Sequence, residues 1–182
     1  MQNIKQFSPA RRVRGVTLVE CLCAVSILAT SVGLALPNLS KWKDRQALLS
    51  AAGELETDIQ YARSMAVAQN GAVHLTVRTA AGGTCYVAYT GEPEACGCAS
   101  GGGAVCSAQA EVRRYADYPA SGAVKLLHRD TTLTFNPRLG TVTPTATFKL
   151  KTSTAGTIHQ IVSIMGRTRS CSPDGIAGIK GC

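Results

Sequence analysis

Two arginines near the C-terminus, Arg167 and Arg169, have the residue type and spacing to bind phosphate groups. If they continue a preceding strand, they project to one face, about 7 Å from each other. Successive phosphates of one DNA strand lie roughly as far apart, and the planar guanidinium fork suits phosphate oxygens. Gly166, just ahead of them, lets the backbone turn or approach closely. Charge alone favours a simpler interpretation, an edge strand whose cations prevent aggregation.

A disulfide between Cys171 and Cys182 would hold the segment that follows these arginines. It closes a 12-residue loop, and loop entropy makes such a constraint worth about 3 kcal/mol. The bridge would fix a tail rich in Gly and bring Lys180 back toward the two arginines. Lys180 is therefore a third candidate cation.

Glu20 is the only charged residue in an apolar run over residues 16–39. As a helix, this run is long enough to cross a bilayer. The cations ahead of it favour a cytoplasmic N-terminal end; they are Lys5, Arg11, Arg12 and Arg14. A carboxylate in lipid costs on the order of a few kcal/mol, which indicates a function. Its expected partner is the α-amino group that cleavage after Gly15 would create on a neighbouring subunit.

The sequence contains no catalytic constellation. Its three histidines, His74, His128 and His159, lie in separate strand-like segments without metal-ligand spacing, and each is expected at a strand surface. No nucleophile elbow and no phosphate loop occurs. We expect a protein that is not an enzyme and that uses no cofactor and no metal.

The eight cysteines fall into two groups. Cys21 and Cys23 lie in the apolar run and are expected to pack as small apolar side chains. The other six are expected outside the cytoplasm, where an even number favours disulfides. Apart from the C-terminal pair, the connectivity stays open among Cys85, Cys96, Cys98 and Cys106. Their spacing does not match paired zinc ligands, which disfavours a zinc site.

A long helix and a β-rich head would position these residues. Apolar and small residues continue the helical period to residue 66, at Leu39, Trp42, Gln46, Leu49, Ala52, Leu55, Ile59, Ala62 and Ala66. Pro37 should kink this helix, and Asn70 with Gly71 should end it.

The head is expected to be mainly antiparallel, which gives an α+β fold. Strands are predicted at 73–78, 85–89, 112–115, 124–128, 132–135, 146–152 and 157–165. Residues 136–140 should form a turn, and the Gly-rich segment 91–109 should form a disulfide-stapled loop that buries no core.

The net charge of +8 is unevenly distributed. Four cations lie in residues 1–15. Residues 16–120 contain seven Lys and Arg against nine Asp and Glu, whereas residues 121–182 contain eight against two. The C-terminal third is therefore expected to face a polyanion.

Three motifs resemble a known family. Gly15 followed by Val-Thr-Leu-Val-Glu resembles the class III signal of type IV pilins and pseudopilins, although Val16 stands where phenylalanine is commonest. Ala-Arg-Ser-Met-Ala-Val at 62–67 is similar to the helix end of the GspH/FimT group of minor pilins and pseudopilins. Gly-Arg-Thr-Arg at 166–169 is similar to the Gly-Arg-x-Arg motif of FimT-type minor pilins.

This resemblance implies a domain organisation and a function. A prepilin peptidase would cut after Gly15 and methylate Val16, and Glu20 would set register during assembly. Residues 1–15 would be the leader, 16–37 the transmembrane and filament-core half of the helix, 38–70 its amphipathic half, and 71–182 the head. The chain would be a single-pass inner-membrane protein with a periplasmic head, then an extracellular part of a pilus with other pilins. Its basic C-terminal region would bind double-stranded DNA for natural transformation.

Two alternatives stay open. The chain could be a structural minor pilin that primes pilus assembly. It could also be a minor pseudopilin of type II secretion, which would not need the Gly-Arg-Thr-Arg motif.

Overall fold

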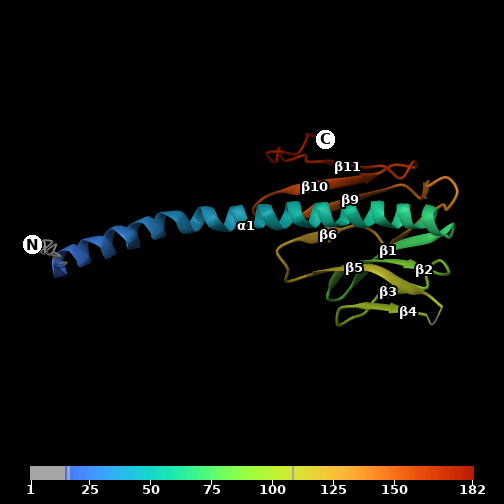
Figure 1. Cartoon of the computed structure of the whole chain (residues 1–182), viewed down its shortest axis with the longest axis horizontal. Coiled ribbons are helices and arrows are strands. Elements are labelled where there is room, and N and C mark those ends of the chain that lie inside the picture. Colours follow the sequence, from blue (N-terminus) through green and yellow to red (C-terminus); the bar gives the residue numbers. More distant parts are fainter. Residues whose placement is uncertain (1–14, 16, 108) are drawn as a thin grey trace, which may run out of the picture. The chain divides into compact units, whose positions relative to one another are not determined.

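The computed structural model describes residue 15, residues 17–107 and residues 109–182, without the side chains of residues 34–38. The chain divides into two compact units, residues 1–39 and 40–182. A helix, α1 (Leu18–Gln69), precedes the strands (Figure 1). These are β1 (Val73–Ala80), β2 (Gly83–Thr90), β3 (Cys96–Cys98), β4 (Ala104–Cys106), β5 (Glu111–Pro119), β6 (Lys125–Leu127), β7 (Thr131–Phe135), β8 (Val142–Thr143), β9 (Ala146–Lys151), β10 (Thr157–Val162) and β11 (Thr168–Cys171). The predicted α+β class is confirmed.

The start of α1 is capped by Thr17. Its Oγ1 accepts a hydrogen bond from the Glu20 backbone N–H at 3.3 Å, the geometry of an N-cap with an acid in the first turn. Apolar side chains of this first unit are exposed, at Leu18, Val19, Leu22, Val25, Ile27, Leu28 and Val32. Cys21 and Cys23 are free and exposed.

The predicted membrane span over 16–37 falls partly on residues that the structure does not describe. Among the described residues, no helix is both long and apolar enough to cross a membrane. Residue 16 and the side chains of residues 34–38 lie outside the described set, as do leader residues 1–14. The span and the leader therefore remain predictions.

At its other end, α1 stops at the predicted residues. Asn70 adopts a left-handed φ of 50°, and the Gly71 N–H donates to the Ala66 carbonyl at 3.2 Å. This arrangement satisfies a carbonyl of the last helical turn.

One stripe of α1 forms the centre of the head core. Its buried members recur at three- and four-residue steps, at Leu48, Ala51, Ala52, Leu55, Ile59, Ala62, Met65 and Ala66. The predicted stripe is wrong in its first turns, because Leu39 and Trp42 are 43% and 56% exposed and Gln46 is exposed too. The described apolar core begins on α1 only at Leu48. Just before it, Arg45 reaches the head through a polar contact, donating to the Ala177 carbonyl at 2.7 Å.

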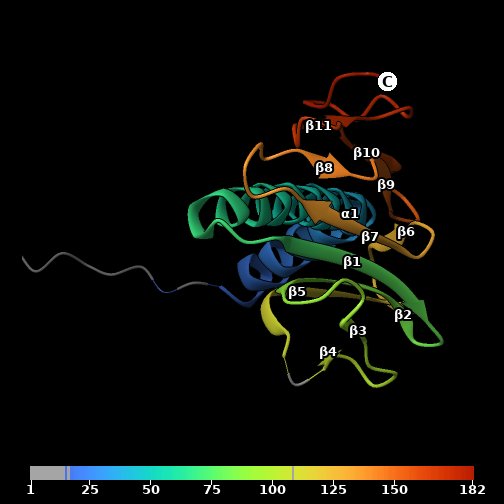
Figure 2. The ribbon, with the colours of Figure 1, turned by 90° about the vertical axis from the view of Figure 1, so that its right-hand side faces the viewer.

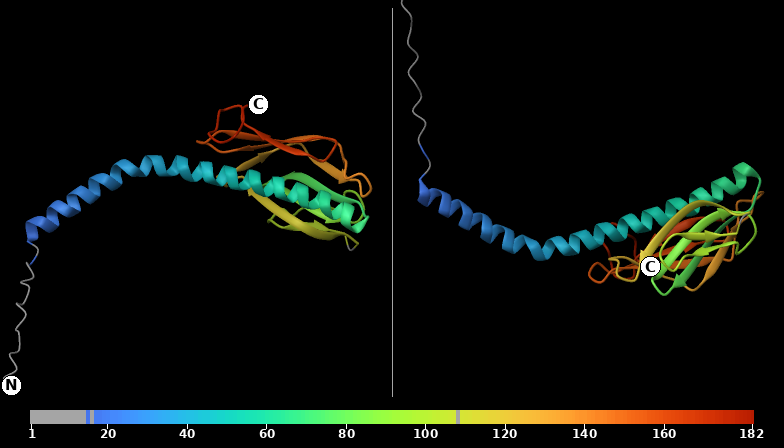
Figure 3. Two further views of the ribbon diagram at one scale, coloured as in Figure 1. Left: turned by 45° about the horizontal axis from the view of Figure 1, so that its top comes forward. Right: turned by 90° about the horizontal axis from the view of Figure 1, so that it is seen from below.

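Two antiparallel sheets share this core with α1. The five-stranded sheet has the order β5-β2-β1-β7-β8, and the four-stranded sheet has the order β11-β10-β9-β6. Figures 2 and 3 show the strands of both sheets lying along the part of α1 that belongs to the head. One apolar cluster joins α1 to both sheets, with Leu75 and Phe135 from the first and Leu150 and Ile158 from the second.

The segment over 91–109 is more ordered than predicted. It forms a small β3–β4 hairpin stapled by disulfides Cys85–Cys98 and Cys96–Cys106. The expectation that it buries no core is wrong, because Cys96 packs in a second apolar cluster with Val87 and Tyr89 of β2. The five-stranded sheet therefore has α1 on one face and this hairpin on the other.

A buried polar contact joins α1 to the five-stranded sheet. Asp58, only 7% exposed, accepts a hydrogen bond from the Tyr86 hydroxyl at 2.8 Å. The Arg114 guanidinium lies 3.5 Å from the same carboxylate and 4.5 Å above the Tyr61 ring. Burial, with the neighbouring Asp58 carboxylate adding to it, raises the pKa of Tyr86, so this hydroxyl stays a donor at physiological pH.

We predict that Tyr86→Phe lowers the free energy of unfolding by about 1–3 kcal/mol, because it leaves a buried carboxylate without its closest donor. Denaturant unfolding of the full chain in a nonionic detergent, followed by circular dichroism, measures this. Tyr61→Phe is the matched control, since the ring of Tyr61 makes the contact with Arg114. Equal stability of the two variants would contradict this role of the Asp58 contact.

His74 is buried, against the expectation of a surface position. It is 2% exposed, its Nδ1 lies 3.0 Å from Thr134 Oγ1, and its ring packs 5.5 Å from the ring of Tyr89. Burial lowers the pKa of His74, and this outweighs the raising effects of the Gly91 backbone and the Glu92 charge. The imidazole is therefore held neutral in the folded head.

We predict that His74 makes the head less stable as the pH falls below about 6.5, the ordinary histidine pKa. In that range the unfolded chain binds a proton that the folded chain resists, so the contribution is fully present above it and is lost below. His74→Gln should lose less stability than the parent between pH 7.5 and 5.5, measured by thermal unfolding. The partly exposed His128, changed to Gln, serves as control; an equal pH effect in both variants would exclude His74 as the source.

Candidate nucleic-acid interface

The candidate arginines belong to a hairpin that returns along the edge of the four-stranded sheet. A turn over 163–166 follows β10, closed by the Gly166 N–H donating to the Ser163 carbonyl at 2.8 Å. Strand β11 then pairs antiparallel with β10, with Val162 opposite Thr168. Arg167 and Arg169 therefore do not continue the preceding strand, which was the condition under which the sequence placed them on one face. The sequence pattern missed the turn because its apolar residues, Ile164 and Met165, extend the apparent strand.

The inward side chains of β11 are hydrogen-bonded to polar side chains beneath them. Gln60 Nε2 donates to Thr168 Oγ1 at 2.8 Å. The Ser170 hydroxyl lies 2.9 Å from Gln160 Oε1 and 3.2 Å from Glu56 Oε2. Gln160 is fully buried and donates in turn to the Ala52 carbonyl of α1 at 2.8 Å. These contacts fix which face of β11 points toward α1.

Because side chains alternate along a strand, the same contacts direct Arg169 of β11 outward. Arg167 lies one residue before β11. Both are exposed. Among the described residues, no carboxylate lies within ion-pair distance of either guanidinium. Their Cα positions, two residues apart, are separated by about 7 Å as strand geometry requires. The structure therefore presents two exposed guanidinium groups at the start of the edge strand, and neither has a carboxylate partner among the described residues.

Gly166 sits where no other residue fits without displacement. Its φ of 69° is left-handed, and a Cβ there would lie 2.7 Å from both Arg63 Cδ and the Gly140 carbonyl oxygen. Arg63 Nε donates to that same Gly140 carbonyl at 2.9 Å, while Gln60 Nε2 reaches the Gly166 carbonyl at 3.2 Å. The hairpin turn is thus pressed against α1 and against the turn over 136–140.

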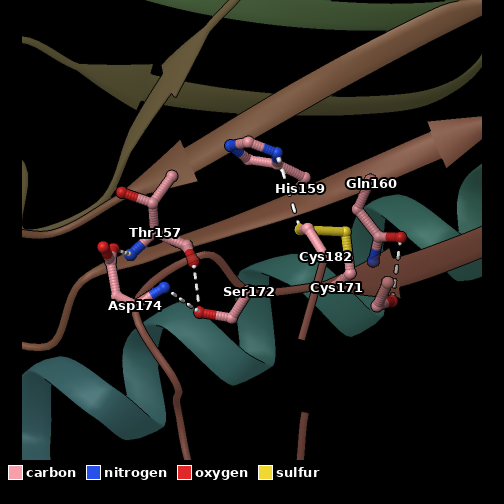
Figure 4. The surroundings of a disulfide bond; sticks show 8 residues. Thr157, His159, Gln160, Cys171, Ser172, Asp174 and Cys182 are labelled. Carbon is pink, nitrogen blue, oxygen red and sulfur yellow. Dashed lines mark hydrogen bonds between the residues drawn. A yellow bond between two sulfur atoms is a disulfide. The ribbon is translucent and has the colours of Figure 1, made fainter. Parts of the chain in front are cut away.

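The C-terminal tail is tied back to β10 and β11, as Figure 4 shows. Cys171 is bonded to Cys182, the pairing predicted from the sequence. The Ser172 hydroxyl donates to the Thr157 carbonyl at 2.9 Å, and Asp174 Oδ2 accepts from the Thr157 N–H at 2.7 Å. The Lys180 carbonyl accepts from the Ser172 N–H at 2.8 Å. Lys180 is exposed and is held beside the residue that follows β11.

The structure does not assemble a metal or catalytic site from these groups. His159 Nδ1 lies 3.8 Å from Cys182 Sγ. His159, Cys171 and Cys182 form a group with metal-ligand spacing in the described part of the chain. Both cysteines are consumed by the disulfide, so neither offers a thiolate ligand. His74 lies far along the chain, in the other sheet.

Sequence reasoning missed the residues that hold the hairpin, namely Glu56, Gln60 and Arg63 of α1. They lie more than 100 residues before the motif that they position. The helical pattern marks them only as polar positions beside the apolar stripe, and nothing in that pattern connects them to β11.

Comparison with known proteins supports a pilin-like chain. Residues 51–166 match the family model described as type II transport protein GspH. The chain is 44% identical over 70 residues to the pilin-like protein PilA1 of Thermus thermophilus, a match that covers 38% of this chain and 44% of that protein. The matched stretch thus spans less than half of the relative's length. No solved structure matches significantly.

We predict that Gly166→Ala destabilises the head more than Gly175→Ala does. Both glycines have a φ of 69°, but nothing lies within 4 Å of a Cβ at Gly175. Each variant should lose about 1–2 kcal/mol for the left-handed backbone, and Gly166→Ala should lose at least about 1 kcal/mol more from overpacking. Denaturant unfolding of both variants measures the difference. Equal losses would mean that the contact with Arg63 and Gly140 does not constrain the turn.

Proposed function

Since the chain belongs to the family of the type II transport protein GspH, whose model matches more than half of it, we propose that it is a minor type IV pilin that binds extracellular double-stranded DNA for uptake in natural transformation. In this proposal Arg167 and Arg169 bind DNA phosphates, Lys180 adds a third cation, and Gly166 shapes the turn before them.

The observation that supports DNA binding best is the pair of exposed arginines at the start of the edge strand, Arg167 just before β11 and Arg169 within it. Neither guanidinium has a carboxylate partner among the described residues, so both are available to phosphate oxygens. The hydrogen bonds of Thr168 and Ser170 beneath them hold the strand in place. The backbone beneath the arginines is thus held, and a planar guanidinium fork loses less conformational freedom per hydrogen bond formed than a lysine does.

Binding of this kind reads the DNA backbone and not its sequence. Phe135 and Phe148, the aromatics of the C-terminal third, are fully buried in the core and cannot stack on bases. Phosphate contacts from Arg and Lys carry no base information and weaken as salt rises, because they release condensed counterions. We therefore assign the surface to sequence-independent capture of a duplex.

Assembly would use the first unit. A prepilin peptidase would cut after Gly15 and methylate Val16 at the inner membrane, and Glu20 would pair with the new amino group of a neighbouring pilin. The exposed apolar side chains of α1, such as Leu22 and Val25, are suited to packing against other pilins in a filament. The head would lie in the periplasm before assembly and outside the cell afterwards.

A second candidate function follows from the description of the matched family, type II transport. A minor pseudopilin of type II secretion, or a pilin that only primes pilus assembly, would use the same helix and head. Neither role requires Arg167 or Arg169 to be unpaired. In a transformable host, substitution of both arginines should abolish transformation with normal piliation. If the double arginine variant transforms normally, or if it loses piliation or secretion, a structural role is favoured.

We predict that Arg167→Ala with Arg169→Ala weakens binding of every duplex sequence alike. The slope of log affinity against log salt should fall in magnitude by about two, one for each lost phosphate contact. Fluorescence titrations of the full chain in nonionic detergent, at several salt concentrations and with two unrelated duplexes, measure both quantities.

The matched control is Lys41→Ala with Lys43→Ala, which removes the same charge from exposed positions on α1. The control should retain most of the parent's affinity. If the two double variants weaken binding equally, the interaction depends only on the net charge of the protein. If the salt slope of the arginine variant is unchanged, β11 is not part of the binding surface.

A further inference from the structure

The outer face of the four-stranded sheet carries a second group of cations. Strand β9 alternates between the core and solvent, with Lys149 and Lys151 exposed. On the edge strand β6, Lys125 is exposed while Leu126 is buried in the core. Residues opposite each other in an antiparallel pair point to the same face. The register therefore places these three lysines on the face that also bears Arg169.

Lys125 and Lys151 are directly opposite each other in the β6–β9 pairing. Like charges in this position destabilise a sheet. Among the described residues, no carboxylate forms an ion pair with either lysine, and strands β6, β9, β10 and β11 contain no Asp or Glu. The Asp44 carboxylate near this end accepts hydrogen bonds from Ser153 and Thr154. Asp174 lies at the neighbouring strand end, where it accepts from the N–H of Thr157, the residue opposite Lys151. Neither carboxylate forms an ion pair with the lysines, so the two ammonium groups stay free to bind an anion.

Protection of a sheet edge explains only part of this arrangement. An exposed lysine on an edge strand discourages pairing with another chain, which accounts for Lys125. Lys149 and Lys151 belong to β9, an interior strand between β10 and β6, where no open edge needs protection. An external anion would give these two lysines a role that edge protection does not.

A groove beside the pair offers room and donors for such an anion. Its volume is about 580 Å³, and Lys125 and Lys151 line it together with the hydroxyl-bearing residues Ser121, Thr152 and Ser153. The Ser153 hydroxyl already donates to Asp44 and Thr152 is buried, so the two ammonium groups are the donors in this groove best suited to phosphate oxygens.

We propose that Lys125 and Lys151 form a second phosphate-binding cluster, and that a DNA duplex lies diagonally across the outer face of the four-stranded sheet from this cluster, past Lys149, to Arg167 and Arg169. This inference rests on the proposed function. Strand spacing and rise put the two ends of the diagonal about 20 Å apart. Each DNA strand presents a phosphate roughly every 3.4 Å of helix axis, so one duplex can meet both clusters at once.

The test compares Lys125→Gln with Lys151→Gln against the charge-matched control Lys41→Gln with Lys43→Gln. Binding of the full chain in nonionic detergent to a labelled 24-base-pair duplex is titrated between 50 and 200 mM salt. Removing two phosphate contacts should lower the magnitude of the slope of log affinity against log salt by about 1.8. Over this fourfold rise in salt, the variant should therefore lose about tenfold less affinity than the parent loses. The control should change it far less.

Stability gives an independent readout of the same pair. Because the substitution removes a like-charge repulsion, the Lys125 and Lys151 variant should unfold at the same temperature as the parent or higher at low salt. A lower unfolding temperature would contradict the net repulsion between the two lysines on which the inference depends. An unchanged temperature also shows that a loss of binding is not a loss of folding.

The outcomes separate the two proposals. If the arginine double variant loses DNA binding and the lysine double variant keeps the parent's slope, the second cluster is wrong and the proposed function stands. If the parent chain does not bind the duplex at any salt concentration, both proposals fail. If the lysine variant matches the Lys41 and Lys43 control, the effect is net charge and the diagonal path is excluded.

Discussion

The structure depends on the attachment of the edge strand β11 to the strand and helix beneath it. Gln60 holds Thr168, and buried Gln160 links Ser170 to the backbone of α1. These bonds are made by one face of the strand, so alternation leaves Arg169 on the opposite face. Arg167 lies just before the strand. A polar inner face is unusual for a strand over a core. Here the polar inner face fixes the register of β11 through directional hydrogen bonds. Apolar packing alone would specify that register less strictly.

The same division between faces runs through the whole four-stranded sheet. Leu126, Leu150 and Ile158 are opposite one another and fill the core, while the outward positions carry the cations. The charge excess of residues 121–182 is therefore collected largely on one surface. The disulfide-stapled β3–β4 hairpin covers the distant face of the other sheet. The five-stranded sheet is thus covered on both faces, whereas the four-stranded sheet has one face that presents cations to solvent.

Much of this organisation could be predicted from the sequence, since it follows local rules. Strand alternation located β1, β2, β9 and β10, and Asn70 with Gly71 marked the helix end. The returning strand β11 was missed because Ile164 and Met165 look like strand residues. Burial of Asp58 and His74 was missed because their partners, Tyr86 and Thr134, are distant in the chain. The arginines could be identified from the sequence. The side chains of α1 that orient them could not, because they too are distant from the arginines in the chain.

The most direct test of the central claim is nuclear magnetic resonance of the arginine side chains in the full chain during titration with a DNA duplex. The Nε–H signals of Arg167 and Arg169 should shift or broaden as phosphate contacts form. That of Arg63, already bonded to the Gly140 carbonyl, should stay unchanged. Shifts confined to other arginines, with Arg167 and Arg169 unaffected at saturating DNA, would contradict the account.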